Sequence, residues 1–287
     1  MSEQRIKLAI QKKGRLAEKS IDALKRCGVE VDTYSARLMV PAKNYPLDLL
    51  LLRDDDIPEY VQDGVADLGV VGENVLYEKG ADCEVTRRLG FGGCRLMIGI
   101  PENEDLEEPA GLRGKRIATS HPNLLKKYLT DNGVEARVVS LSGSVEIAPS
   151  LGVADAICDI VSTGNTLTFN KLKKSLVVFE SEAALVANRE SLKAKRAEID
   201  ELLDRIDSAL ASKRSKYLML NAPKDRIDEI LEIVPALDSP TVLSLADDKF
   251  VALHAVIPTK TFWEIRRRLQ EAGATGIIIL PIDNIIV

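Results

Sequence analysis

Short apolar runs alternate with amphipathic segments along most of the chain. In its first part, the apolar runs predict strands, and the segments of helical periodicity between them predict helices. The expected strands are 6–10, 47–52, 68–71 and 96–100, and the expected helices are 16–27 and 57–63. Strands that alternate with helices are typical of parallel sheets covered by helices, so we expect an α/β fold.

A polar stretch at 102–109 predicts a surface crossing into a second lobe. The pattern after it predicts strands at 116–119, 136–141, 155–161 and 176–179, with helices at 122–132 and 145–151. The apolar segment 183–187 then leads back to a long charged helix at 191–212. Two lobes joined by two crossings usually enclose a cleft, and ligands of open α/β sheets bind beyond the carboxyl ends of the strands.

The segment 216–287 has a separate rhythm. It predicts, in order, a strand at 217–221, a helix at 224–234, strands at 241–245 and 250–257, a helix at 260–272 and a strand at 276–280. This βαββαβ order is that of a ferredoxin-like domain, a fold that does not by itself establish a role. We therefore expect three parts, which are 1–96 with 184–215, then 97–183, then 216–287.

The segment 155–166, DAICDIVSTGNT, is the first candidate for chemistry. It predicts an apolar strand followed by a turn of hydroxyl side chains around a glycine. Such a turn can bind a phosphate, because glycine lets the backbone approach closely and the N-terminus of the next helix adds partial positive charge. An ordinary Ser/Thr helix cap is the alternative.

Two carboxylates belong to the same segment. Asp155 and Asp159 are four residues apart, which predicts that they share one face of the strand. They are suited to hold two ribose hydroxyls or a hydrated magnesium ion, and the alternative is that both are simply solvated.

A basic cluster, Lys12-Lys13-Gly14-Arg15, follows the first expected strand and precedes a helix. A basic loop with a glycine at a helix start is a second anion site, suited to a diphosphate. A solvated surface turn is the alternative for so short a run.

Composition narrows the classes of partner. The 287 residues are 45% hydrophobic and 29% charged, which is typical of a globular protein. The sequence shows neither an apolar run long enough to span a bilayer nor the pattern of a signal peptide. We therefore expect a cytoplasmic protein with no membrane partner. A net charge of -5 argues against a general nucleic-acid binder. The four cysteines lack C-x-x-C spacing and the two histidines stand alone, so neither disulfides nor a zinc site is predicted, and the thiols are expected in the core.

Several motifs together carry a resemblance to a known family. They are QKKGRL at 11–16, LRDDDIP at 52–58, DLGVVGEN at 67–74, FGGCRL at 91–96, GKRIATS at 114–120, SGSVE at 142–146 and the segment 155–166. The third domain adds SKY at 215–217, SPT at 239–241 and AGA at 272–274. With these motifs in this order, the chain resembles the long form of ATP phosphoribosyltransferase, the enzyme of the first committed step of histidine biosynthesis.

The resemblance implies two periplasmic-binding-protein-like lobes that form a catalytic cleft, and a C-terminal domain that binds histidine as a feedback inhibitor. It also implies transfer of the phosphoribosyl group of phosphoribosyl pyrophosphate to N1 of ATP, with release of pyrophosphate. Mg²⁺ would be the cofactor, carried by pyrophosphate near Asp155 and Asp159 rather than held by direct protein ligands. The implied assembly is a hexamer built from dimers.

Site residues follow from the same resemblance. Asp155 and Asp159 would hold ribose hydroxyls. The residues expected at the 5-phosphate are Ser162, Thr163, Gly164, Asn165 and Thr166. Those expected at pyrophosphate or at the phosphates of ATP are Lys12, Gly14 and Arg15, and those expected near the nucleotide are Arg53, Glu73 and Arg95. The alternatives are that Glu73 caps a helix, that Arg53 pairs with Asp54 to Asp56 and that Arg95 is structural.

For the effector, two loops of the third domain are candidates. They contain Asp238, Ser239, Pro240 and Thr241 in one case, and Gly273 and Ala274 in the other. A carboxylate suits the ammonium group of an amino acid, and exposed glycine N–H groups suit its carboxylate, with ordinary turns as the alternative. His254 is expected to be a packed or interface residue, and His121 a capping or surface residue.

Two other functions compete with the enzyme. A non-enzymatic, two-lobed sensor of small ligands would use the same lobes, because fold does not fix function. A DNA-linked regulator is a weaker rival, because the acidic chain shows no basic recognition helix.

Overall fold

The computed structural model describes residues 5–32, 37–161 and 165–286. The chain divides into two compact units, Met1–Asp22 with Glu30–Ile199, and Ala23–Val29 with Asp200–Val287. We call them unit 1 and unit 2. The division falls inside helix α7 (Arg196–Lys213), so most of this helix belongs to unit 2.

Unit 1 contains two sheets, each the centre of one lobe. The sheet of lobe I has the order β2-β3-β1-β4-β11-β5. Its strands are β1 (Ile6–Gln11), β2 (Met39–Pro41), β3 (Leu47–Leu52), β4 (Leu68–Gly72), β5 (Glu84–Arg88) and β11 (Ala183–Ala187). Strand β1 is parallel to β3 and β4, whereas β11 is antiparallel to β4 and β5. The helices of this lobe are α1 (Arg15–Arg26), α2 (Ile57–Gln62), α3 (Glu73–Lys79) and α6 (Arg189–Ala194).

Lobe II has a sheet of order β10-β6-β9-β7-β8. Its strands are β6 (Cys94–Pro101), β7 (Arg116–Thr119), β8 (Arg137–Ser140), β9 (Ala156–Val161) and β10 (Leu172–Ser181). Strand β7 is parallel to β8 and β9, and β6 is antiparallel to β9 and β10. The helices are α4 (Pro122–Asp131) and the short α5 (Asn165–Phe169).

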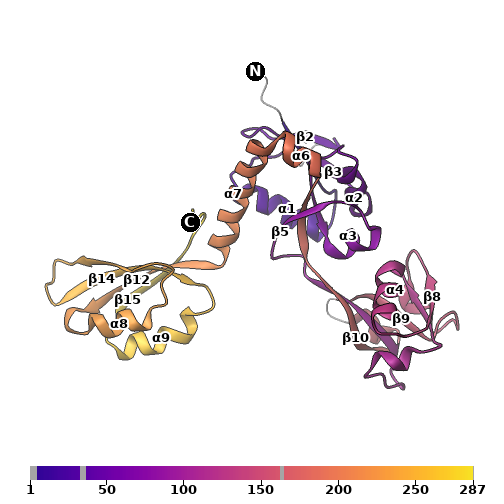
Figure 1. The fold of residues 1–287 in the computed structure, drawn as a ribbon. Coiled ribbons are helices and arrows are strands. Elements are labelled where there is room, and N and C mark those ends of the chain that lie inside the picture. The colour runs from indigo at the N-terminus through magenta and orange to yellow at the C-terminus, as the bar shows by residue number, and fades with distance from the viewer. Residues whose placement is uncertain (1–4, 33–36, 162–164, 287) are drawn as a thin grey trace. The chain divides into compact units, whose positions relative to one another are not determined.

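Two crossings join the lobes, as expected. One runs through residues 89–93 between β5 and β6, and the other is Glu182 between β10 and β11. Figure 1 shows β10 leading from one lobe into the other. The short second crossing places a single residue between the two sheets.

Some details of the expected elements were wrong. Both sheets are mixed rather than parallel, because β2 and β11 in lobe I and β6 in lobe II run opposite to their neighbours. The apolar pattern predicts a strand but not its direction. The expected helix at 145–151 is only the 3₁₀ turn Val145–Ile147. The expected helix at 191–212 is interrupted at Lys195, where α6 ends before α7 begins.

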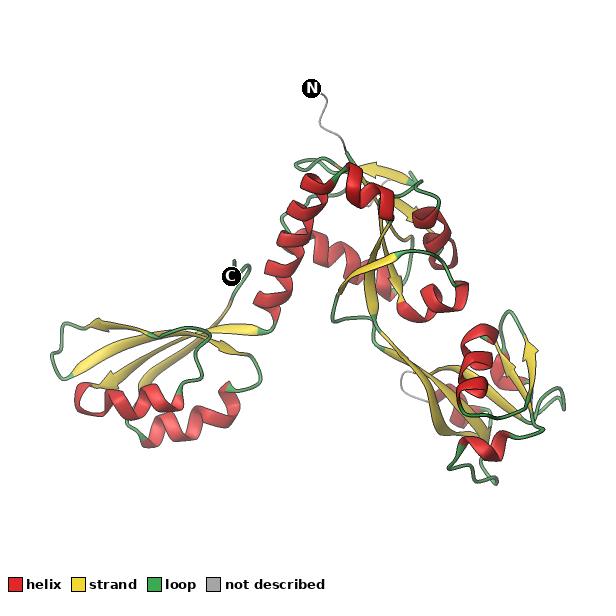
Figure 2. Ribbon diagram, viewed as in Figure 1, coloured by secondary structure: helices red, strands yellow, loops and turns green. Residues whose placement is uncertain are grey.

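Unit 2 contains a four-stranded antiparallel sheet of order β13-β14-β12-β15. Its strands are β12 (Ser215–Pro223), β13 (Thr241–Ser244), β14 (Phe250–Pro258) and β15 (Thr275–Pro281), with helices α8 (Ile227–Ile233) and α9 (Phe262–Glu271) between them. Figure 2 shows both helices on one face of this sheet. The predicted βαββαβ order and the α/β fold class are therefore confirmed.

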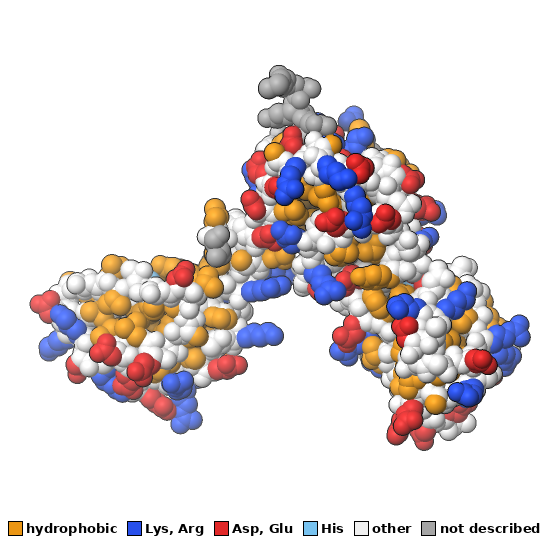
Figure 3. All heavy atoms as spheres, in the orientation of Figure 1, with side chains coloured by type: hydrophobic (Ala, Val, Ile, Leu, Met, Phe, Trp, Pro, Cys, Tyr) orange, Lys and Arg blue, Asp and Glu red, His pale blue; other side chains and the backbone are white. Residues whose placement is uncertain are grey.

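The face of the molecule in Figure 3 carries charges of both signs, and two of the four cysteines lie in the core, where all four were expected. On the face drawn in Figure 3, basic and acidic side chains are intermixed. Cys27 and Cys158 are buried, whereas Cys83 and Cys94 are half-buried. None of the helices in the described ranges is long and apolar enough to cross a membrane.

Candidate active site

The carboxyl ends of the parallel strands gather the candidate loops in each lobe. Strands β1, β3 and β4 run in the same direction, so Lys12, Arg53 and Glu73, which follow them, lie at one edge of the sheet. In lobe II, the parallel strands β7, β8 and β9 end at Thr119, Ser140 and Val161. These edges are where open α/β sheets bind ligands.

A cavity of about 600 Å³ lies between the two lobes of unit 1. Lobe I contributes residues of α3 and of the 3₁₀ turn before α2, and lobe II contributes the ends of β7 and β8. The lining residues are Asp55, Val75, Glu78, Lys79, Ser120, His121, Pro122, Asn123, Ser140, Leu141 and Ser142. The expected inter-lobe cleft is therefore present, and hydroxyl groups are frequent on its lobe II side.

The basic loop occupies the position that the sequence predicts. It begins after β1 and ends where α1 starts at Arg15, and the side chains of Lys12 and Arg15 are exposed. The backbone N–H of Lys12 donates to the Leu52 carbonyl at 2.7 Å, which fixes the loop to the end of β3. Gly14 has φ +99°, a conformation that favours glycine.

Part of the predicted phosphate loop lies outside the described residues, namely Ser162, Thr163 and Gly164. The flanking elements are those expected, because β9 ends at Val161 and α5 begins at Asn165. Thr166 is exposed in the first turn of α5. Phosphate binding by this loop stays a prediction.

Asp159 lies toward the carboxyl end of β9 and is half-buried. Burial raises the pKa of its carboxyl group, against the opposing effects of the Ile160 N–H and of His121. That N–H donates to Asp159 Oδ1 at 2.7 Å. A carboxylate held in this way keeps acceptor positions for hydroxyl groups of a ligand.

Asp155 has a different setting, immediately before β9. Its Oδ1 accepts from Arg116 Nη2 at 2.7 Å, and its Oδ2 accepts from Arg116 Nε at 3.2 Å and from the backbone N–H of Arg116 at 2.8 Å. These bonds lower the pKa of Asp155 to about 2. The carboxylate is thus engaged in joining β9 to β7.

The pairing of Asp155 with Asp159 on one ribose is therefore not supported. In the β7–β9 register, Asp155 neighbours the first residue of β7, whereas Asp159 follows Cys158, the partner of Thr119 at the end of β7. Four residues of extended strand span roughly 13 Å, too far for two carboxylates to hold adjacent hydroxyls. The spacing predicts the shared face but not this separation.

Glu73 does not face the cleft as expected. Its carboxylate is buried and pairs with Arg88 Nε at 2.9 Å, and its backbone N–H donates to the Glu182 carbonyl at 3.0 Å. It makes no cap bond for α3 either, since Gly72 is the N-cap residue. Glu182 is the second crossing and Arg88 ends β5, so Glu73 holds the start of α3 against both.

The two predicted arginines have contrasting surroundings. Arg95 Nε pairs with Glu180 at 2.9 Å across β6 and β10, which agrees with the structural alternative. Arg53 is exposed at the end of β3, and within the described ranges no ion pair joins it to Asp54, Asp55 or Asp56. It stays a candidate for ligand contact.

Sequence reasoning missed a buried polar contact between the lobes. Asn74 Nδ2 lies 3.2 Å from His121 Nε2, and Ser181 Oγ donates to Asn74 Oδ1 at 2.9 Å. His121 is only 9% exposed, so the expectation of a surface residue was wrong, and it is the N-cap residue of α4 without a side-chain cap bond. Nearby, the Glu78 carboxylate accepts from the first N–H groups of α4. A lone histidine before a proline gave no signal of a contact between lobes.

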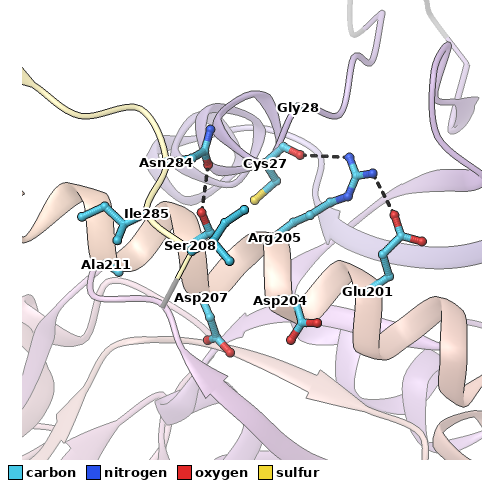
Figure 4. Close-up of a pocket in the computed structure, with 11 residues that line it drawn as sticks. Cys27, Gly28, Glu201, Asp204, Arg205, Asp207, Ser208, Ala211, Asn284 and Ile285 are labelled. Carbon is cyan, nitrogen blue, oxygen red and sulfur yellow. Dashed lines mark hydrogen bonds and ion pairs between the residues drawn. The ribbon is translucent and has the colours of Figure 1, made fainter.

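Unit 2 contains a larger cavity, of about 860 Å³, whose lining is acidic (Figure 4). Glu201, Asp204 and Asp207 border it from α7, and its one lining arginine, Arg205, pairs with Glu201 at 2.8 Å among the residues described. Asn284 of the C-terminal segment accepts from Ser208 Oγ at 3.3 Å. The negative charge of this lining disfavours binding of a polyphosphate. The volume of a cavity therefore does not by itself identify the substrate site.

The predicted effector loops lie at opposite edges of the unit 2 sheet. Asp238, Ser239 and Thr241 line a cavity of about 220 Å³ beside Tyr217 and His254, whose Oη and Nδ1 atoms are 2.9 Å apart. His254 is thus half-buried and in contact with Tyr217.

Gly273 and Ala274 belong to the turn before β15, the other edge strand, and their N–H groups already donate to carbonyls at the end of α9. One chain therefore does not bring the two loops into one site. The sequence places both loops before strands, but the β13-β14-β12-β15 order separates them.

Comparisons with known proteins agree with this architecture. Residues 53–208 match the family model described as ATP phosphoribosyltransferase, and residues 212–284 match the HisG C-terminal domain. An ATP phosphoribosyltransferase of Cytophaga hutchinsonii is 49% identical over 281 residues, covering 98% of each chain. One of Parabacteroides distasonis is 45% identical over 282 residues, covering 98% of this chain and 100% of the relative.

A solved structure also matches. The ATP phosphoribosyl transferase (HisG:HisZ) complex from Thermotoga maritima aligns with a TM-score of 0.61 and 34% identity, over 70% of this chain and 96% of that one. Together with the two family models and the near full-length relatives, this likeness confirms the resemblance found in the sequence. The chain therefore belongs to the ATP phosphoribosyltransferase family, the enzymes of the first step of histidine biosynthesis.

Proposed function

We propose that the cleft of unit 1 transfers the phosphoribosyl group of phosphoribosyl pyrophosphate to N1 of ATP and releases pyrophosphate. ATP and phosphoribosyl pyrophosphate are the substrates of the family. The observation that carries the proposal is the inter-lobe cleft, which is lined by the segments that follow β3 and β4 and by the ends of β7 and β8. Strands β1 and β9 end at the same edges of their sheets as these strands.

The proposed roles of the loops follow from the hydrogen-bond donors and charges that their sequences supply. The loop after β9, with Asn165 and Thr166 at the start of α5, would hold the 5-phosphate. The exposed side chains of Lys12 and Arg15, together with the backbone at Gly14, would bind pyrophosphate or the phosphates of ATP. Asp159 would hold ribose hydroxyls, and Asp155 would support the strand through Arg116. Adenine N1 is already nucleophilic, so the site mainly needs to orient the substrates and stabilise the leaving group.

The family requires a divalent metal, and we propose that it is Mg²⁺. The donor set fits an ion that arrives with pyrophosphate. Mg²⁺ usually keeps several waters and binds to substrate phosphates, and the Asp159 carboxylate, toward the end of β9, would accept hydrogen bonds from the waters of such an ion without ligating it directly. The bound ion would stabilise negative charge on departing pyrophosphate.

Regulation would belong to unit 2. The cavity beside Tyr217 contains Asp238, which suits the ammonium group of histidine, and the hydroxyls of Ser239 and Thr241, which suit its carboxylate. The proposed assembly is a hexamer built from dimers, as in the family that the sequence resembles.

A single assay tests activity and regulation together. The protein is incubated with ATP, phosphoribosyl pyrophosphate and Mg²⁺, with and without histidine, and pyrophosphate release is followed with the near-ultraviolet absorbance of the nucleotide. We expect both signals without histidine and a lower rate with it. Binding of either substrate without turnover would favour the two-lobed sensor instead. Full activity at saturating histidine would reject the proposed regulation alone.

A further inference from the structure

The inter-lobe contact contains a chain of hydrogen bonds that ends at the cleft. Asn74 begins α3 in lobe I, His121 precedes α4 in lobe II, and Ser120 is the neighbouring residue that lines the cavity. The Nε2 atom of His121 is 3.2 Å from Asn74 Nδ2, and its Nδ1 atom is 3.0 Å from Ser120 Oγ. Both ring nitrogens therefore have a partner, one in each lobe.

The surroundings of Asn74 assign the histidine tautomer. Ser181 Oγ donates to Asn74 Oδ1 at 2.9 Å and accepts from the Asn74 backbone N–H at 3.0 Å. The amide oxygen is thereby occupied, and the amide presents its Nδ2 donor to His121. Nε2 must then be the acceptor, so a neutral His121 carries its proton on Nδ1.

This tautomer fixes the direction of the Ser120 hydroxyl. The Nδ1–H group donates to Ser120 Oγ, and the hydroxyl hydrogen is left to point elsewhere. Within the described ranges, no second side chain hydrogen bonds to Ser120 Oγ, and its residue lines the cleft. Because β7 neighbours β9 with Thr119 opposite Cys158, Ser120 lies beside the segment that contains Asp159.

We infer that Ser120 is a further substrate-binding residue, donating a hydrogen bond to an oxygen of a phosphate group of phosphoribosyl pyrophosphate, and that His121 is the residue that positions it. Asn74 sets the tautomer, so the donor is correctly oriented when lobe I is seated against lobe II. The inference rests on the proposed function of this cleft. The buried contact between Asn74 and His121 would thus both join the lobes and orient a substrate-binding hydroxyl.

Kinetic constants of four variants test the inference. Ser120→Ala removes the hydroxyl donor. His121→Leu removes the imidazole that orients this donor and replaces it with an apolar side chain that can stay equally buried. Each is expected to raise KM for phosphoribosyl pyrophosphate about 10- to 100-fold, as expected for loss of one hydrogen bond to a charged group, with KM for ATP little changed. The double variant is expected to be no worse than Ser120→Ala, because both changes remove one interaction. His121→Asn, whose amide can replace the Nδ1 donor, is expected to restore most of the affinity.

A control separates this role from general packing of the lobes. Tyr77 and Phe179 form another contact between α3 and β10, with ring centroids 5.5 Å apart. Tyr77→Leu is expected to lower thermal stability without the selective rise in KM for phosphoribosyl pyrophosphate. An unchanged KM in Ser120→Ala, additive effects in the double variant, or equal losses in His121→Asn and His121→Leu would each overturn the inference.

Two further measurements keep the test decisive. If His121→Leu does not fold, Asn74→Ala leaves the ring in place and is expected to raise the same KM; an unchanged KM would reject the role of the tautomer. If the wild-type protein releases no pyrophosphate, the proposed function fails, and calorimetric titration with phosphoribosyl pyrophosphate and Mg²⁺ tests Ser120 by itself. Equal dissociation constants for wild type and Ser120→Ala would then reject the inference.

Discussion

Replacing each of two aspartates by asparagine separates substrate binding from strand support. Asp159→Asn keeps the shape of the side chain but removes the charge that we assign to the ribose hydroxyls. A hydrogen bond to a charged group contributes about 1.5–3 kcal/mol, and asparagine still offers one acceptor. The loss for two hydroxyls is therefore about 2–4 kcal/mol, or roughly 30- to 1000-fold in kcat/KM. Stability should stay level or rise slightly, because burial already disfavours the charged form of Asp159.

Asp155→Asn is the matched change at the other end of β9. It weakens the bonds to Arg116, but both side chains are more than a third exposed, so solvent screening limits the loss to a few degrees in Tm. The pKa of Asp155 in the folded protein is lowered to about 2, compared with about 3.9 in the unfolded chain. The ionised carboxylate therefore contributes its full stabilisation of the fold above about pH 3.9, and this stabilisation is lost as the pH falls through about 2. We expect kcat/KM within about threefold of wild type.

Pyrophosphate release at varied phosphoribosyl pyrophosphate gives kcat/KM, and thermal unfolding at pH 7 and near pH 2 gives stability. The Tm difference between wild type and Asp155→Asn should shrink at the lower pH. If Asp155→Asn lost as much activity as Asp159→Asn while its Tm stayed at the wild-type value, the division of labour between the two aspartates would be refuted.

Three other changes test packing, a buried ion pair and regulation. Gly69→Ala places a Cβ 2.7 Å from Ile57 Cγ2, so it should destabilise unit 1 by about 1–3 kcal/mol in urea unfolding; wild-type stability would contradict this packing. Lys195→Met removes the ammonium group 2.7 Å from the buried Asp67 carboxylate, which keeps the Lys7 N–H and the Ser191 hydroxyl as donors. The change should cost about 3–5 kcal/mol, and a loss under about 1 kcal/mol would argue against a desolvated pair. Asp238→Ala should raise the histidine concentration for half-inhibition about tenfold or more, and an unchanged value would place the effector elsewhere.

The sequence by itself determined the local elements and the loops between them. The apolar runs of β1 and β9, and the glycine-containing turn after β1, are set by neighbouring residues, so periodicity and turn chemistry predict them. The βαββαβ order of unit 2 follows for the same reason. Family motifs then indicated the activity without any tertiary structure.

Only the tertiary structure decided which polar groups meet. Arg116 and Asp155 are 39 positions apart, and Asn74 and His121 are 47 apart, so strand register and lobe packing bring them together. The two loops predicted to bind the effector look equivalent in sequence but lie at opposite edges of one sheet. Local patterns fix which face of an element is buried, whereas the partner of a polar side chain depends on distant strands, whose order the local pattern does not encode.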